Sequence, residues 1–212
     1  MMKFETLLAL FSDQPIFDFA SVVVLCGESR ESTRVALHRM KKAGRIIELK
    51  RGLYAFAAPY RRVPLNAAKL ANLLYAPSYL SERWALSWYG VIPEKTVIYT
   101  SVTTRPTRSF ENAMGNFQYR TIQTTLFGPY RTDTIMSQEI HIASPEKALF
   151  DLWYLEHGEW TQARMESHRF EPRNVDTAAL RALVTACRLP RLARAMHAWE
   201  DYAREAAQGI MI

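Results

Sequence analysis

Basic residues between Arg30 and Arg51 are the part of the sequence whose types and spacing could do chemistry. This stretch holds eight Lys and Arg residues against two acids, Glu31 and Glu48. Guanidinium and ammonium groups are the side chains that neutralise phosphates and read guanine edges in nucleic acids. A solvated face usually mixes both signs of charge, so the imbalance favours a surface that binds DNA.

Helical spacing separates these cations from a buried stripe. The residues predicted to be buried follow i, i+3, i+4, i+7 and are Thr33, Ala36, Leu37 and Met40. On the opposite face we predict contacts with base edges in the major groove from Arg34, His38 and Lys42, with Arg30 and Ser32 near the start of the helix. The predicted contacts with DNA phosphates are made by Lys41, Arg45, Lys50 and Arg51.

Three helices and a hairpin must position these side chains. Apolar spacing predicts helices over residues 4–11, 17–25 and 29–43, and Gly44 provides the last stop. Two strands, 46–49 and 53–56, then flank a turn in which Gly52 takes a positive φ. Three helices followed by a two-stranded hairpin is the order of a winged helix-turn-helix.

The charge of the chain is divided unevenly along its length. Residues 1–62 carry 11 Lys and Arg against 6 Asp and Glu, whereas residues 63–212 carry 16 against 15. Residues 59–66 contain two prolines and have no apolar periodicity, which is typical of a linker. We therefore predict a DNA-binding domain over 1–58, a linker over 59–66 and a second domain over 67–212.

The second domain has a mixed α/β pattern. Helices are predicted over 67–74, 81–89, 144–156, 176–187 and 190–207, with Ser144 as N-cap and Pro145 in the first turn of the third. Strands are predicted over 96–103, 116–125 and 139–143. The fold class is therefore α+β: an N-terminal winged helix-turn-helix followed by a mixed α/β C-terminal domain with terminal helices.

The chemistry of an enzyme is poorly represented. No glycine-rich phosphate loop, GxSxG or HExxH pattern occurs, and the five histidines are scattered. Glu139 and His141, or Asp133, Glu139 and Lys147, could be drawn as small sites, but strand alternation explains the first pair and the second spacing is loose. We predict no catalytic residue, no metal and no cofactor.

The aromatic residues between Tyr75 and Tyr89 have two interpretations. They could form a ligand cage or a stacking platform, but packing of two helices on a sheet is commoner. The two cysteines lack CxxC spacing, no cleavable leader is recognisable, and no apolar run reaches the length of a membrane span. These observations predict a cytoplasmic protein with no membrane partner.

Four stretches resemble one known family. "LHRMKKAGRIIELKRGLYAF" (37–56) resembles the winged-helix N-terminus of AbiEi-type antitoxins, the transcriptional-regulator half of bicistronic phage-defence toxin–antitoxin systems. In the second domain the resemblance rests on "SYLSERWALSWYGVIPE" (78–94), "YTSVTTRP" (99–106) and "HIASPEKALFDLWYL" (141–155). The last stretch is the most specific, since generic winged-helix regulators lack it.

The resemblance implies a function for each domain. The first would bind double-stranded DNA at inverted repeats in its own promoter and repress the operon. The second would counteract a nucleotidyltransferase-like toxin encoded alongside. The operator sequence, the oligomeric state and the toxin are left open. Two rival hypotheses are a ligand-responsive winged-helix transcriptional regulator without a toxin partner, and a winged-helix enzyme.

Overall fold

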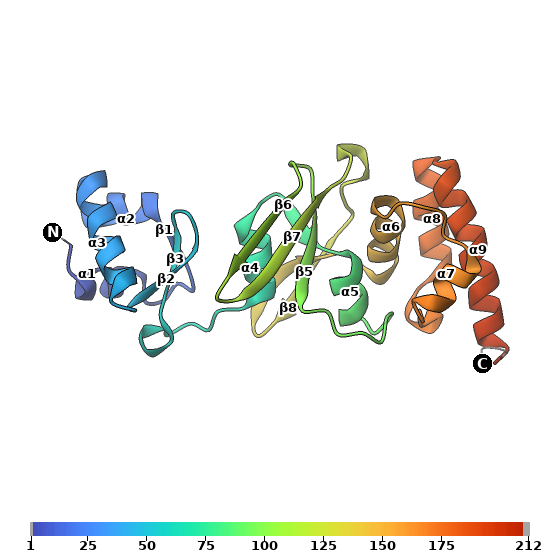
Figure 1. Cartoon of the computed structure of the whole chain (residues 1–212), viewed down its shortest axis with the longest axis horizontal. Helices are drawn as coiled ribbons and strands as arrows, with labels where there is room; N and C mark the ends of the chain where they lie inside the picture. Colours follow the sequence, from blue (N-terminus) through green and yellow to red (C-terminus); the bar gives the residue numbers. More distant parts are fainter. Residues whose placement is uncertain (1, 210–212) are drawn as a thin grey trace. The chain divides into compact units, whose positions relative to one another are not determined.

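The computed structural model describes residues 2–209, which form helices and sheets in the predicted α+β combination (Figure 1). The chain divides into two compact units. The first comprises residues up to Ala67 together with Phe110–Gly115, and the second comprises Ala68–Ser109 and the chain from Asn116 onward. Within the described residues, no helix combines the length and the apolar character that crossing a membrane requires.

The first unit contains three helices and a three-stranded sheet. Its elements are α1 (Phe4–Phe11), β1 (Phe17–Asp18), α2 (Phe19–Cys26), α3 (Arg30–Lys42), β2 (Ile46–Lys50) and β3 (Leu53–Phe56). β3 is the middle strand and runs antiparallel to both neighbours. The three predicted helices and the predicted hairpin are confirmed, with small shifts at their ends.

The predicted helix over 17–25 was wrong at its start, where β1 forms instead. Phe17 lies opposite Tyr54 in β3, and Asp18 lies opposite Leu53. The Asp18 carboxylate accepts a hydrogen bond from the Ser21 backbone N–H at 2.9 Å, so Asp18 is the N-cap and α2 begins at Phe19. A strand of two residues is too short to show a period, which is why the apolar pattern did not reveal it.

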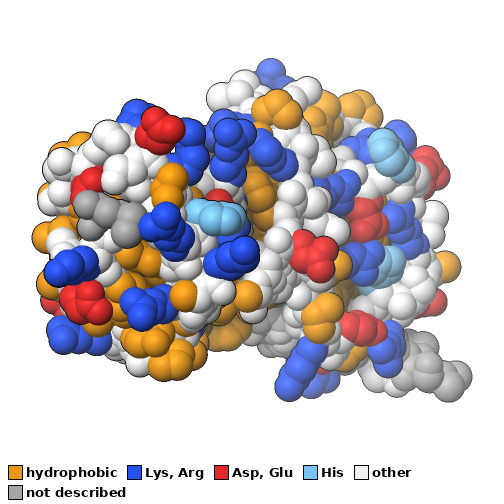
Figure 2. All heavy atoms as spheres, turned by 60° about the vertical axis from the view of Figure 1, so that its left-hand side comes forward, with side chains coloured by type: hydrophobic (Ala, Val, Ile, Leu, Met, Phe, Trp, Pro, Cys, Tyr) orange, Lys and Arg blue, Asp and Glu red, His pale blue; other side chains and the backbone are white. Residues whose placement is uncertain are grey.

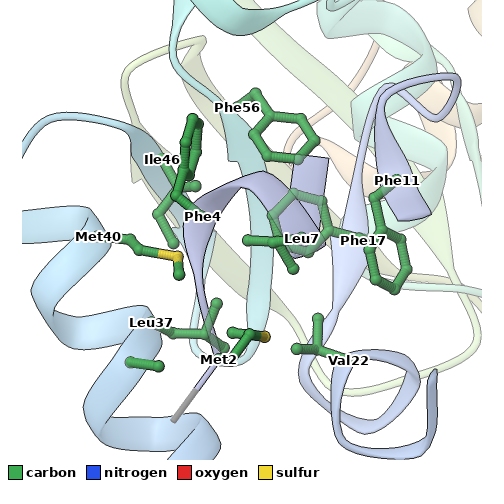
Figure 3. Packing of buried hydrophobic residues seen from close by; sticks show 11 residues of the cluster. Met2, Phe4, Leu7, Phe11, Phe17, Val22, Leu37, Met40, Ile46 and Phe56 are labelled. Carbon is green, nitrogen blue, oxygen red and sulfur yellow. The ribbon is translucent and has the colours of Figure 1, made fainter. Parts of the chain in front are cut away.

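One hydrophobic core holds the helices of the first unit against its hairpin (Figure 3). Its buried residues are Met2, Phe4, Leu7, Phe11, Phe17, Val22, Ala36, Leu37, Met40, Ile46 and Phe56. The rings of Phe17 and Phe56 have their centroids 5.0 Å apart, so aromatic contact links β1 to β3. Side chains from α1, α3 and the hairpin converge in this core, which fixes the position of α3.

The predicted linker is packed over its first residues. A short 3-10 helix, η1 (Ala58–Tyr60), follows β3. The Tyr60 ring lies edge-on to Phe4 with 4.9 Å between centroids, and Arg61 donates from Nε to the Phe56 carbonyl at 2.9 Å. Tyr60 and Arg61 therefore extend the packing of the first unit, a role that proline content alone does not indicate.

The second unit is built on a six-stranded sheet with the order β6-β7-β5-β4-β9-β8, of which only the residues around the β6–β7 turn, Phe110–Gly115, are assigned to the first unit. Its strands are β4 (Ser78–Leu80), β5 (Ile98–Thr103), β6 (Arg108–Asn112), β7 (Gly115–Thr121), β8 (Arg131–Ile135) and β9 (Gln138–Ile142). Its helices are α4 (Ala67–Leu74), α5 (Glu82–Trp88), α6 (Pro145–Leu155), α7 (Gln162–Ser167), α8 (Thr177–Cys187) and α9 (Pro190–Ala207), and it also contains the 3-10 turns η2 (Thr124–Leu126) and η3 (Pro172–Asn174). β5 and β7 are parallel, as are β4 and β9.

The predictions for this unit succeed for its longer elements. The five predicted helices correspond to α4, α5, α6, α8 and α9, and Ser144 caps α6 by accepting a hydrogen bond from the Lys147 N–H at 3.2 Å. The strand predicted over 116–125 was wrong beyond Thr121, where the chain leaves β7 and turns through η2. β4, β6, β8 and α7 were not predicted.

The stretches 78–94 and 141–155 meet in a buried polar network. The Asp151 carboxylate accepts hydrogen bonds from Tyr79 Oη at 2.9 Å and Ser81 Oγ at 2.7 Å, and it pairs with Lys147 one helical turn away. Lys147 also donates to the Leu126 carbonyl at 2.9 Å. The exposed fraction is 1% for the Lys147 side chain and 0% for Asp151, so the pair is closed to solvent.

A second ion pair lies beside this network. Arg120 in β7 donates to Glu82 Oε2 at 2.5 Å and also contacts the Leu155 carbonyl. Glu82 opens α5 with a φ of 51° and is buried, and its other oxygen, Oε1, has no hydrogen-bond partner within residues 2–209. Burial is the largest influence on this carboxyl and raises its pKa to about 7, against the opposing effect of Arg120.

Candidate nucleic-acid interface

Helix α3 has the two faces that its sequence predicts. Its buried residues are Thr33, Ala36, Leu37 and Met40, which is the predicted stripe. Side chains at the other positions are exposed or half-buried. Burial of the stripe leaves the opposite face of a 13-residue helix available to a partner.

The outward face of α3 combines cations with one apolar side chain. Val35, His38, Arg39 and Lys42 follow i, i+3, i+4, i+7, so they share a face, and all four are exposed. His38 and Lys42 were predicted to be there, whereas Val35 and Arg39 were not among the predicted DNA contacts. Val35 keeps 42% of its surface exposed and offers an apolar contact on this face.

Arg34 lies on the flank of α3 that is turned toward the hairpin. Its positive charge acts on the Tyr54 hydroxyl of β3, whose pKa is nevertheless raised because burial dominates. Arg34 is exposed and could reach a groove from this flank. The structure therefore places Arg34, which was grouped with His38 and Lys42, within the electrostatic reach of β3.

The start of α3 is organised by hydrogen bonds from side chains. Ser29 caps the helix by accepting from the Ser32 N–H at 3.1 Å, and Ser32 Oγ donates to Glu28 at 2.6 Å. The Arg30 guanidinium lies 5.2 Å from the centre of the Phe19 ring, a cation–π contact that ties it to α2. Ser32 would have to exchange its bond to Glu28 before it could contact a base.

Lys41 forms an ion pair that the sequence did not predict. Its Nζ lies 2.5 Å from Glu48 Oε2 in β2, and the side chains keep 45% and 26% of their surfaces exposed. The bond from Lys41 lowers the pKa of Glu48, against the effect of burial, so the carboxylate stays charged at neutral pH. One of the two acids in the basic stretch is thereby neutralised within the protein.

Arg45 is positioned by the end of α3. Gly44 adopts a φ of 66°, the predicted stop, and backbone bonds join Gly44 N–H to the Lys41 carbonyl and Arg45 N–H to the Met40 carbonyl, each at 3.0 Å. This is a Schellman motif, which reverses the chain into β2. The Arg45 guanidinium lies 5.0 Å from the centre of the Phe4 ring and remains exposed.

The hairpin turn carries Lys50 and Arg51. The pairing of β2 with β3 shifts register between Glu48 and Lys50, and Gly52 takes a φ of 79° in the turn, as predicted. The Gly52 carbonyl accepts a hydrogen bond from the Phe19 N–H at 2.9 Å, which anchors the turn to α2. Arg51 is exposed at the tip and Lys50 is half-buried.

These elements form one surface of predominantly positive charge. Figure 2 shows Lys and Arg side chains gathered over the face of the first unit, with a few acids and apolar side chains among them. Glu31 stays exposed one turn before Val35 on the outward face of α3. With Glu48 paired to Lys41, Glu31 is the acid of the 30–51 stretch that no ion pair described within residues 2–209 neutralises.

The alternative sites in the second unit are not assembled. Glu139 and His141 are exposed on β9, where they alternate with the buried Ile140 and Ile142. Strand alternation therefore explains their spacing. Within residues 2–209 no group of three or more His, Cys, Asp or Glu side chains is arranged to hold a metal ion.

The first unit has a helix with an apolar inner stripe and a cationic outer face, and a cationic hairpin follows it. This arrangement is typical of proteins that bind nucleic acid. Residues 5–57 match the family model of AbiEi antitoxin transcriptional regulators. The resemblance seen in the sequence is thereby confirmed for this stretch, which runs from α1 to the end of β3. A comparison with curated proteins found no match.

Proposed function

We propose that this protein is a transcriptional regulator that binds double-stranded DNA through a winged helix-turn-helix in its first unit. The observation that carries the proposal is the outward face of α3, on which cations surround an exposed valine while the opposite stripe is buried. Such a helix fits the major groove of B-DNA, which is about 12 Å wide. The family match to residues 5–57 supports the same assignment.

Base edges and phosphates take different side chains in this proposal. Arg34, His38 and Lys42 face base edges, and Val35 adds an apolar contact that suits the methyl group of thymine. Arg45, Lys50 and Arg51 contact phosphates on either side of the groove, which sets register and affinity. Lys41 joins them only when it exchanges Glu48 for a phosphate.

The same proposal includes repression of the protein's own operon and antitoxin activity. Inverted repeats in the promoter are the expected operator, and a nucleotidyltransferase-like toxin is the expected opponent of the second unit. Support comes from the family match and from the resemblance of residues 78–94 and 141–155. These stretches also meet in the buried network of Tyr79, Ser81, Lys147 and Asp151, so they form one structural element of the second unit.

A ligand-responsive regulator without a toxin partner is the second candidate function. The observation that favours it is a hollow of about 480 Å³ between α8 and α9. Volumes of this size are typical of sites for small molecules.

DNA binding is tested by fluorescence anisotropy with a duplex from the protein's own promoter and a random duplex of equal length. Changing Lys50 and Arg51 together to Ala should weaken binding to both duplexes, and the slope of log K against log salt should fall by about 0.9 per lost contact. Arg34→Ala should instead reduce the preference for the promoter, by about 1–3 kcal/mol for a contact with guanine. The matched control is Lys95→Ala, which removes an exposed cation of the second unit.

Unchanged promoter preference in Arg34→Ala, with the slope unchanged in the double variant, would refute the assignment of the interface. Antitoxin activity is tested with full-length protein carrying Arg34, His38 and Lys42 changed to Ala. It should rescue growth from a toxin expressed from an independent promoter while leaving the operon derepressed. Loss of rescue by this variant, if it remains folded, would contradict the division of roles between the units.

A further inference from the structure

A groove lies between α8 and α9, and the residues that line it are far in the sequence from the proposed DNA-binding residues. It has a volume of about 480 Å³. The residues that line it are Arg181, Val184, Thr185, Arg188, Leu189, Pro190, Ala193, Met196, His197 and Glu200. Arg181 lies on α8 and Arg188 is the residue that caps its C-terminal end two turns further on, so the two are ~10 Å apart along the helix axis.

The groove has an apolar middle and two different ends. Leu189, Pro190 and Ala193 provide most of its apolar surface, and Val184 and Met196 also line it, although each keeps only 4% of its surface exposed. At one end the Arg181 Nε donates to Glu200 Oε1 at 2.7 Å, so these charges neutralise each other. His197 also approaches Glu200, with its Nδ1 3.9 Å from Oε2.

Arg188 at the other end has no such compensation. It forms no ion pair or side-chain hydrogen bond with another residue of the described chain, 2–209. Its backbone is left-handed, with φ 53° and ψ 31°, at the end of α8, where glycine is the residue that adopts this conformation without cost. Residues held in unfavourable backbone conformations cluster at binding sites. The chain thus keeps an uncompensated cation at a position that favours glycine.

We propose that the groove binds a small amphiphilic carboxylate, with its head on Arg188 and its apolar chain along Leu189, Pro190 and Ala193, above the nearly buried Val184 and Met196. Charge complementarity determines the orientation, because the paired Arg181 and Glu200 leave no net charge at the far end. This inference does not rest on the proposed DNA-binding function, since no residue of the first unit takes part.

Octanoate is the probe. Octanol has the same apolar chain without the carboxylate, and acetate has the carboxylate without the long chain, so these two compounds are the controls. Full-length protein labelled at methionine methyl groups is titrated with each compound and followed by NMR. Met196 lines the groove and keeps 4% of its surface exposed, whereas Met165 is fully buried elsewhere and serves as internal reference. Octanoate should shift the Met196 signal saturably and leave Met165 unchanged, and acetate should shift neither.

Two substitutions at Arg188 test the role of its guanidinium in binding while the protein stays folded. Arg188→Gly removes the charge at a position that suits glycine, so the protein should stay folded while its affinity for octanoate falls about tenfold or more. Arg188→Lys keeps a positive charge and should retain most of the affinity. The inference is overturned if octanol binds as tightly as octanoate, if Arg188→Gly binds octanoate like the unchanged protein, or if Met196 does not respond.

Discussion

Replacing Glu48 with glutamine should strengthen DNA binding, because this carboxylate holds Lys41 away from phosphate. Lys41 and Glu48 are 2.5 Å apart, and both side chains remain partly exposed. Glutamine keeps the shape and can still accept a hydrogen bond from the Gly52 N–H, which lies 3.4 Å from Glu48 Oε1. An exposed ion pair contributes about 0–1 kcal/mol to stability, so the fold should survive the change.

The size of the effect follows from counterion release. One additional phosphate contact steepens the slope of log K against log salt by about 0.9. When salt is reduced fourfold, the affinity of Glu48→Gln should therefore rise roughly threefold more than that of the unchanged protein. Anisotropy titrations between about 50 and 200 mM salt would measure both quantities. The promoter duplex and a random duplex should gain affinity equally, since a phosphate contact carries no sequence information.

Asp13→Asn is the matched control, because it removes the same charge from the first unit at a residue far from α3 in the sequence. Asp13 keeps 88% of its side-chain surface exposed and lies 3.6 Å from Arg62. If both variants gain affinity equally, net charge rather than Lys41 is responsible. If Glu48→Gln weakens binding, then Glu48 positions Lys41 for DNA and our reasoning is wrong.

Further predictions concern α3 and the buried network. Val35→Ala should reduce affinity for the promoter by about 1 kcal/mol through lost apolar contact, with the salt slope unchanged; equal loss on random DNA would contradict a base contact. Lys147→Met should lower the free energy of unfolding in urea by about 3–5 kcal/mol by leaving Asp151 without its cation, and adding Asp151→Leu should restore part of it; a loss under about 1 kcal/mol would show that Asp151 does not need Lys147. Burial raises the pKa of Glu82 from 4.5 to about 7, so the folded state holds this proton more tightly than the unfolded chain. Its contribution of about 3 kcal/mol is present at pH 4 and is lost as the pH rises to about 7, and Glu82→Gln should flatten urea-unfolding stability over this range relative to the unchanged protein.

Local patterns in the sequence determined the first unit almost completely. The buried stripe of α3 is a matter of 3.6-residue periodicity, and Gly44 and Gly52 take the positive φ angles that their places in a stop and a turn require. These features act over a few residues, so they can be recognised without knowing which distant segments meet. The cationic character of the 30–51 stretch was evident for the same reason.

The tertiary structure alone decided which charges are available. Whether Lys41 is free depends on Glu48, which reaches it from β2 only after the hairpin has folded back on α3. The exposure of Val35 likewise follows from how α3 packs. The composition gives the number of cations, but their availability to DNA depends on which of them form ion pairs within the protein.

The sheet of the second unit also depends on contacts between distant segments, which local sequence does not predict. β4 is three residues long and buried on both faces, so it has no alternation to recognise, and it exists because β5 and β9 pair with it. Ser81 and Asp151, 70 residues apart, meet only through that pairing. The sequence by itself determined the longer helices, the turns at Gly44 and Gly52 and the charge of this protein. Long-range pairing decided the sheet, the buried network and the groove beside Arg188, because the free energy of those contacts depends on neighbours that local sequence does not specify.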